Sequence, residues 1–429
     1  MKKFVVFTLI SAMTAGAVFA QVADGISFQA WGRGSIVPLR VEGPPTTNGK
    51  TDKDGDGDEM EAQLKAGTGA TWGGANRVDF RMQGNASYAG FKFNATAEQD
   101  QLMGGDEGAY LWVKPFKNDY LKLTAGYLVD DTLRGKIGLD GFTKFVMIGG
   151  PGDEDTIFSR FGTSHSWTNF TNGSESNGGF MLSSKPTDDF FIGLMANAGQ
   201  YDDAKDVYRN MQIGLGYNIG GIGHVRAQWI GGYLGEDPED GDPDTELNPA
   251  QPARIELAFA LTALDGLLLD IGTKLYMPVS GKSGWEKSNG IAVSVGATYR
   301  NQAFNLVGRV DAKGLGAHDH KDKKDKSTSG WEADVRLVPA YDLDFATVGA
   351  SIAAIFKAAG DGYDGKTPDD NVESRIGFGG FIGRSLGNGN VKAGLGFITG
   401  PILSGDRQKN ESVSGFIFQV PIILEYAFF

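Results

Sequence analysis

A repeated alternation of apolar and polar side chains, in segments of about ten residues, most strongly limits how this chain can fold. It is clearest at the C-terminal end, where every second residue from Phe416 to Phe428 is apolar or aromatic. The residues between them include Gln419, Pro421 and Glu425. A period of two is typical of a β-strand with one apolar face. The chain is therefore expected to end in a long strand whose two faces lie in different surroundings.

The same alternation recurs along the chain, at residues 78–83, 91–98, 210–218, 254–259 and 331–337. Almost no stretch shows the helical period, and after the N-terminal segment no apolar run is long enough for a membrane-spanning helix. A soluble β-sandwich also alternates. In lipid, however, a sheet must close on itself to satisfy its backbone hydrogen bonds. The pattern predicts a transmembrane barrel with apolar residues toward lipid and charged or small residues toward a wet lumen.

The N-terminal segment predicts export. Lys2 and Lys3 precede an apolar stretch at residues 4–15, and small residues follow at 17–20, as in a secretory signal peptide. We therefore expect residues 1–20 to be removed and residues 21–429 to form a single barrel. The chain has no cysteine, so disulfides, a lipid-modified cysteine and thiolate metal sites are excluded.

The connections between the alternating segments predict the topology. Short turns rich in Asp, Asn and Pro at 111–121, 182–191, 260–268 and 336–345 alternate with long acidic links at 42–59, 235–249, 314–329, 358–371 and 400–411. This is typical of an all-β, antiparallel up-and-down barrel with short periplasmic turns and long extracellular loops. We expect about eighteen strands, with sixteen as the alternative. Their centres fall near residues 31, 80, 95, 112, 124, 181, 195, 213, 229, 258, 273, 295, 308, 335, 351, 378, 396 and 421.

Several segments carry a resemblance to a known class of proteins. They are residues 28–39 (FQAWGRGSIVPL), 111–115 (LWVKP) and 121–127 (LKLTAGY), together with the terminal Phe428 and Phe429. In these segments the chain resembles porin-type outer-membrane barrels, and its general sequence pattern is similar to that of treponemal (spirochaetal) outer-membrane proteins. The resemblance implies outer-membrane lipid, the barrel-insertion machinery (through the C-terminal strand) and small hydrophilic solutes as partners. It also makes a homotrimer a candidate assembly.

Residues 130–174, which follow the fifth predicted strand, form the candidate pore constriction. In porin-type barrels this loop folds into the lumen and narrows it. The charged candidates are Asp130, Asp131, Arg134, Lys136, Lys144 and Arg160. The alternative is a large external loop with its own small core.

The predicted lumen face carries many bases, and acidic residues alternate with them. The candidate pore-lining residues are Arg81, Lys122, Arg226, Arg254, Lys274, Arg309, Arg336 and Arg375. The formal net charge of −13 falls by two, to −15, once Lys2 and Lys3 leave, and most of the excess lies in loops. Acidic loops disfavour nucleic acid as a partner and favour weak cation preference at the pore mouth. The mixed lumen face leaves ion selectivity open.

One loop carries half of a calcium-binding pattern. Asp52, Asp54, Asp56 and Asp58 alternate, with Gly57 at the sixth position, but Gln63 stands where the pattern needs a bidentate Glu. Calcium binding and a solvated acidic loop are both open interpretations. No other cofactor is expected.

Enzymatic signals are weak. Among the four histidines only His224 lies in a predicted strand, and no nucleophile motif accompanies it. We therefore expect a protein that is not an enzyme. The leading hypothesis is a passive diffusion channel for small hydrophilic solutes and ions. The alternative is a surface adhesin or antigen whose long loops bind host ligands.

Overall fold

The computed structural model describes residues 25–42, 45–47, 50–51, 61–66, 77–98, 101–126, 179–197, 211–231, 253–280, 286–320, 327–328, 330–358, 372–399, 413–414 and 416–427. Their regular structure is entirely β. Within these ranges, no helix has the length and apolar character needed to span a membrane. The regions that are left out include the predicted signal peptide, the candidate constriction at 130–174 and the candidate calcium residues Asp52, Asp54, Asp56 and Asp58.

Most of the described residues belong to one large antiparallel sheet of nineteen strands. Its strands are β1 (Ile26–Glu42), β4 (Glu61–Ala66), β5 (Arg77–Asn85), β6 (Ala89–Glu98), β7 (Gln101–Val113), β8 (Lys122–Gly126), β9 (Gly179–Ser184), β10 (Phe190–Asn197), β11 (Gln212–Ile219), β12 (Gly223–Ile230), β13 (Arg254–Leu264), β14 (Leu267–Tyr276), β17 (Ile291–Asn301), β18 (Phe304–Leu315), β21 (Trp331–Asp342), β22 (Thr347–Ala358), β23 (Val372–Leu386), β24 (Gly389–Thr399) and β26 (Phe416–Ala427).

The sheet closes into a barrel because its first and last strands pair. β26 runs antiparallel to β1 from Trp31 opposite Ala427 to Glu42 opposite Ile417. Strands β4 and β5 lie along the same side of β1, β5 against its first half and β4 against its second. A circuit of the barrel therefore crosses eighteen strand positions rather than nineteen, as predicted. Each of the eighteen predicted centres lies in a different strand of this ring.

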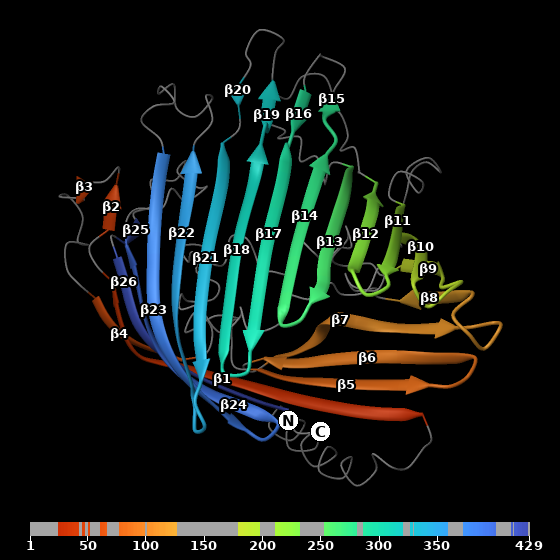
Figure 1. Cartoon of the computed structure of the whole chain (residues 1–429), viewed down its shortest axis with the longest axis horizontal. Helices are drawn as coiled ribbons and strands as arrows, with labels where there is room; N and C mark the ends of the chain where they lie inside the picture. Colours follow the sequence, from red (N-terminus) through yellow and green to blue (C-terminus); the bar gives the residue numbers. More distant parts are fainter. Residues whose placement is uncertain are drawn as a thin grey trace.

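Figure 1 shows how strongly the strands tilt around the barrel. The strands from β11 to β23 run upright in this view, whereas β1, β5, β6 and β7 run across them on the other wall. Strands that tilt by about 35–45° to the barrel axis cross those of the opposite wall at twice that angle. The crossing of the strands in Figure 1 is therefore the arrangement expected of a closed barrel with tilted strands.

The connections at the two ends of the barrel differ in length. One end, called here the short-turn end, holds the start of β1, the end of β26 and tight links such as residues 265–266, 302–303 and 387–388. The predicted alternation has one exception at the opposite end, where Glu98 pairs with Gln101 and only two residues join β6 to β7. The remaining links at that end are long, as predicted.

Two small sheets lie at the long-link end. One contains β15 (Val279–Ser280), β16 (Glu286–Ser288), β19 (His318–His320) and β20 (Ser327–Thr328), which Figure 1 shows above β14, β17 and β18. The other contains β2 (Pro45–Thr47), β3 (Lys50–Thr51) and β25 (Val413–Ser414). The predicted long link at 314–329 therefore contains two short strands, β19 and β20. Short strands form there because β16 and β19 continue the pairing of β17 with β18 beyond the barrel.

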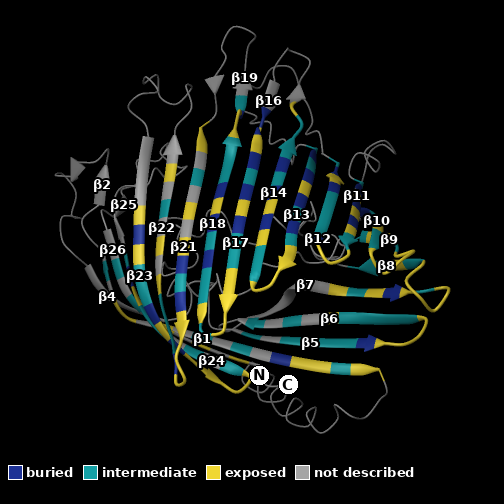
Figure 2. Ribbon diagram, in the orientation of Figure 1, coloured by how far each residue is buried: buried dark blue, intermediate teal, exposed yellow. Residues whose placement is uncertain are grey.

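The two faces of the barrel differ in polarity. On β11, Ile213, Leu215 and Tyr217 are exposed on the outside, whereas Gln212 is buried on the inside. Figure 2 shows this alternation of buried and exposed residues along β13, β14 and β17. A soluble protein would bury its large apolar side chains, but here they face outward along almost every strand. The outer surface is therefore suited to lipid.

Exposed aromatic side chains mark both ends of the outer apolar surface. At the short-turn end they are Tyr88, Phe116, Tyr120, Tyr217, Tyr299, Phe304, Tyr341, Phe345 and Tyr426, and at the other end Phe180, Trp229, Trp331 and Phe356. Trp331 and Tyr341 lie ten residues apart on β21. That is about 33 Å along a strand and about 23–27 Å along the barrel axis after tilt. Membrane barrels carry an apolar band of about 25 Å between such aromatic girdles.

Candidate functional site

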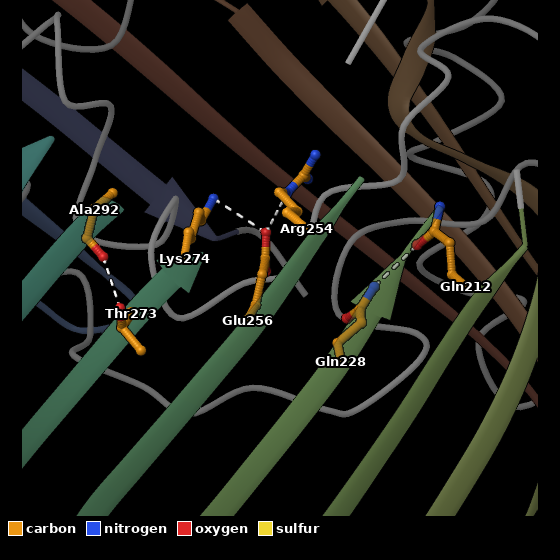
Figure 3. A network of polar contacts seen from close by, with 7 residues as sticks. All are labelled: Gln212, Gln228, Arg254, Glu256, Thr273, Lys274 and Ala292. Carbon is orange, nitrogen blue, oxygen red and sulfur yellow. Dashed lines mark hydrogen bonds and ion pairs between the residues drawn. The ribbon is translucent and has the colours of Figure 1, made fainter. Parts of the chain in front are cut away.

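The candidate site is the inner wall from β11 to β18, where polar side chains from successive strands lie side by side. The pleat sends alternate residues inward, and the register brings neighbouring inward residues into rows. Gly214 lies opposite Gln228, Gln228 opposite Glu256, and Glu256 opposite Lys274. Figure 3 shows two groups of contacts on this wall, one between Gln212 and Gln228 and one among Arg254, Glu256 and Lys274. The buried polar members are Gln212, Gln228, Arg254, Glu256, Asp270, Lys274, Ser294, Arg309 and Asp311.

A glutamine pair begins the row. The Nε2 group of Gln228 donates a hydrogen bond to Oε1 of Gln212 over 2.9 Å (Figure 3). Both side chains are almost fully buried. The pair is uncharged, so it fixes the wall without attracting ions.

Glu256 binds two cations at once. Its Oε1 lies 2.6 Å from Nε of Arg254 and 3.5 Å from Nζ of Lys274 (Figure 3). Arg254 lies two residues before Glu256 on the same face of β13, and Lys274 lies opposite it on β14. Buried charges are tolerated only when they are paired and hydrogen-bonded, so this triad holds its three side chains in fixed positions.

A second charged cluster lies on β17 and β18. Nε of Arg309 donates to both oxygens of Asp311 at 2.9 and 2.8 Å, and Nη2 donates to Oγ of Ser294 at 2.6 Å. Asp311 lies opposite Ser294 in the register. Two N–H donors of this guanidinium, on Nε and Nη2, are therefore directed by protein contacts, which gives it one orientation.

Arg226 belongs to a third group, closer to the short-turn end. Its Nη2 donates to Oδ1 of Asn218 at 3.2 Å, and Nδ1 of His224 lies 2.8 Å from the same oxygen. The guanidinium stem lies over Gly216, where an added Cβ would be 2.9 Å from Cδ of Arg226. Gly216 therefore makes room for the arginine on the inner wall.

An aromatic and lysine cluster lies at the short-turn mouth. The ammonium groups of Lys114 and Lys122 lie 4.9 and 5.3 Å from the centre of the Trp112 ring. Lys114 also pairs with Asp119 at 2.6 Å. Cations favour the face of an indole, so Trp112 stabilises both lysines on the wall.

The structure distributes the predicted pore-lining bases over the barrel. It joins Arg254 and Lys274 through Glu256 and places Arg309 two strands farther along the wall than Lys274. Arg226 lies with His224, Lys122 lies beside Trp112, and Arg81 lies opposite Gln29. Arg336 and Arg375 are in β21 and β23, but their side chains lie outside the described part. That these residues line a conducting pore stays a prediction.

The constriction candidates Asp130, Asp131, Arg134, Lys136, Lys144 and Arg160 also lie outside the described residues, as do the candidate calcium ligands. Gln63, the twelfth position of the calcium pattern, lies in β4 opposite Arg40, so a strand follows the pattern where an EF-hand has a helix. Within the described ranges, no three acidic or histidine residues gather as a metal ion would require.

Sequence reasoning missed the uncharged members of the wall. The alternation of the sequence places three of them, Gln212, Gln228 and Ser294, on the inner face of their strands. That alternation could have identified them, but only charged residues were singled out. Trp112 was missed because an aromatic residue in such a segment is expected to face lipid.

Taken together, the fold and its inner wall define a closed antiparallel barrel of the outer-membrane type, with an apolar band outside and a polar face inside. The fold is similar to an anion-selective porin from Comamonas acidovorans, with 11% identity, a TM-score of 0.48 and coverage of 94% of this chain and 100% of that one. It is also similar to OmpT, an outer membrane protein of Vibrio cholerae, with 12% identity, a TM-score of 0.47 and coverage of 95% and 98%. The outer membrane channel DcaP of Acinetobacter baumannii gives 10% identity, a TM-score of 0.44 and coverage of 94% and 97%. No protein-family model and no curated protein matches the sequence.

Proposed function

We propose that this protein is an outer-membrane porin, a passive diffusion channel for small hydrophilic solutes and ions. The observation that carries the proposal is the closed ring of eighteen strand positions with apolar residues outside and charged residues inside. In a ring of this size, side chains from opposite walls do not meet, so an aqueous passage remains. Lipid on the outside and water with solutes on the inside are the partners that such a wall requires.

The inner wall supports weak rather than strong ion selectivity. Its buried charged residues are Arg254, Lys274 and Arg309 as cations, and Glu256, Asp270 and Asp311 as anions. Three charges of each sign produce little net potential, although the acidic long links add a preference for cations at that mouth.

We further propose that residues 130–174 narrow the passage. They follow β8, which is the fifth strand position of the ring, and join it to β9. Ser294, Arg309 and Asp311 are at most 3% exposed, although they face the inside of a wide barrel. Their burial supports a covering layer over this part of the wall, and the link after β8 is long enough to supply one.

Conductance in planar bilayers tests the proposal directly. The refolded protein should produce discrete, ohmic current steps in KCl, and proteoliposomes should swell in small sugars faster than in large ones. Boiled protein is the matched control because it has the same composition without the barrel. Intact barrels that neither conduct ions nor admit sugars would contradict the proposal.

The alternative function, a surface adhesin or antigen, is favoured by one observation. The sheet of β15, β16, β19 and β20 gives the long links a rigid platform above the barrel. Binding of host matrix proteins to intact cells, lost when residues 318–328 are replaced by a short Gly-Ser link, would support this role beside or instead of conduction.

Location and assembly complete the proposal. The signal-peptide pattern at residues 1–20 and the C-terminal strand support export to the outer membrane and recognition by the barrel-insertion machinery. A homotrimer and the likeness to treponemal proteins remain predictions, and mass measurement in mild detergent would decide the first of them.

A further inference from the structure

Asp270, on β14, is an inner-wall carboxylate that the contacts above leave unused among the described residues. Its side chain is 4% exposed, and neither carboxylate oxygen has a hydrogen-bond partner in the described part of the structure. An ionised carboxylate shielded from water is unfavourable unless a cation or hydrogen-bond donor accompanies it. Asp270 therefore offers two acceptor atoms to a cationic group.

Arg309 offers the complementary donor. Its Nε and Nη2 atoms are fixed by Asp311 and Ser294, but Nη1 is buried and has no partner among the described residues. Because two sides of the guanidinium are already held, the direction of the third is set before any ligand arrives. A preorganised guanidinium edge favours carboxylate and phosphate groups.

The backbone register sets these two groups on either side of a glycine. Asp270 lies opposite Gly296 on β17, and Gly296 lies opposite Arg309 on β18. Adjacent strands are about 4.8 Å apart, so the two backbones are about 9.6 Å apart. Glycine has no side chain, so nothing from β17 separates the two groups in this row.

We propose that Asp270 and Arg309 form a binding site for a small solute that carries one cationic and one anionic group, such as an α-amino acid. The ammonium group binds the carboxylate of Asp270, and the carboxylate group binds Nη1 of Arg309. This names a solute class for the proposed channel and rests on that function. The buried charges of this wall are three of each sign, so a single ion gains little there, whereas a zwitterion is bound at both ends.

Saturation-transfer NMR on the full-length protein in detergent tests the site. The probes are glycine, glycinamide and acetate, which have similar size and carry both charges, only the cation or only the anion. We expect glycine to bind more tightly than either. Asp270→Asn keeps the shape of the side chain and should weaken glycine binding about tenfold, as expected for loss of one charged hydrogen bond.

Two further variants sharpen the test. Arg309→Lys should weaken glycine and acetate alike, because the lysine ammonium is taken up by Asp311 and Nη1 is lost. Asp342→Asn is the matched control, since Asp342 already accepts hydrogen bonds from Asn305 and Thr347, and it should leave glycine binding unchanged. Heat-modifiable migration in gels confirms that each variant is folded.

The result that would overturn the proposal is glycine binding no tighter than acetate or glycinamide in the wild-type protein, or binding unaffected by Asp270→Asn. If Asp270→Asn does not fold, the comparison of the three probes on the wild-type protein still decides. Binding needs no conduction, so the two proposals fail separately. If the protein conducts ions but shows no preference for glycine, the channel proposal stands and the binding site is contradicted. If it binds glycine but does not conduct, the binding site stands and the channel proposal is contradicted.

Discussion

At the residue scale, four glycines of the barrel have a specific use: each lies opposite a large side chain on the neighbouring strand. In four register pairs, a Cβ on the glycine would come within 3 Å of the partner side chain, which is closer than packing allows. The pairs are Gly84 with Phe91, Gly90 with Trp112, Gly216 with Arg226, and Gly349 with Phe381. The alternating sequence predicts which face a residue takes, but not which glycine receives which ring, because that depends on register.

Gly90→Ala is therefore expected to displace the Trp112 indole. The added Cβ would lie 2.2 Å from Cζ2 of Trp112 and 2.3 Å from the backbone oxygen of Gly84. Overpacking of this kind costs about 1–3 kcal/mol, so the melting temperature of the barrel should fall. Circular dichroism in detergent measures it. Gly380→Ala is the matched control, since its nearest contact would be an ordinary 3.7 Å, and an equal loss of stability in both variants would contradict the explanation.

The inner wall shows the same limit of residue-scale prediction. The alternation of inward and outward residues along each strand was sufficient to assign Arg254 and Arg309 to the inner face of the barrel. Their partners were not predictable, because Arg254 shares Glu256 with a residue on the next strand and Arg309 takes a serine from β17. These two contacts connect residues 15 and 18 positions apart and follow from strand pairing rather than from local sequence.

At the element scale, the sequence predicted all eighteen strand positions because each strand carries its own amphipathic period. Strand β4 was missed, although Ala62, Leu64 and Ala66 alternate with Glu61, Gln63 and Lys65. Its six residues follow an acidic segment and precede a glycine-rich one, which favoured a loop. The short strands beyond the barrel were unpredictable for a different reason: two or three residues contain no measurable period.

The closing strand β26 should be essential for assembly. Tyr426 pairs with both Gly32 and Gly389, and Ala427 pairs with Trp31, so the last residues join the end of the chain to its beginning. Deleting residues 426–429 removes these pairs and the exposed aromatic ring at the membrane boundary. We expect loss of heat-resistant barrels in gels and loss of the protein from the outer membrane.

A deletion of equal length at residues 405–408, in the link between β24 and β25, is the control and should leave assembly intact. Heat-resistant, surface-located protein after removal of residues 426–429 would show that closure does not depend on this end.

At the scale of the whole molecule, the barrel has two unlike ends, and their direction in the membrane determines what the outside of the cell meets. Asp119 and Asp188 lie in turns at the short-turn end, whereas Asp244 and Lys323 lie in links at the other. Long links are extracellular in bacterial barrels. Protease-cleavable tags at Asp244 or Lys323 should therefore be cut on intact cells, and tags at Asp119 or Asp188 only after lysis. The reverse pattern would invert the assigned orientation.

The last prediction concerns how wide the passage is. If residues 130–174 narrow the lumen, replacing them by a short link should raise single-channel conductance and speed the entry of larger sugars. Changing Arg134, Lys136 and Arg160 to Glu should shift selectivity toward cations, because charges in a narrow, poorly screened passage act strongly on ions. The same change at Lys321, Lys323 and Lys324, in the link between β19 and β20, should do much less, since salt screens exposed charges. Equal effects of the two triple variants on reversal potential, or unchanged conductance after the replacement, would place residues 130–174 outside the passage and leave the buried inner wall to be covered by another segment.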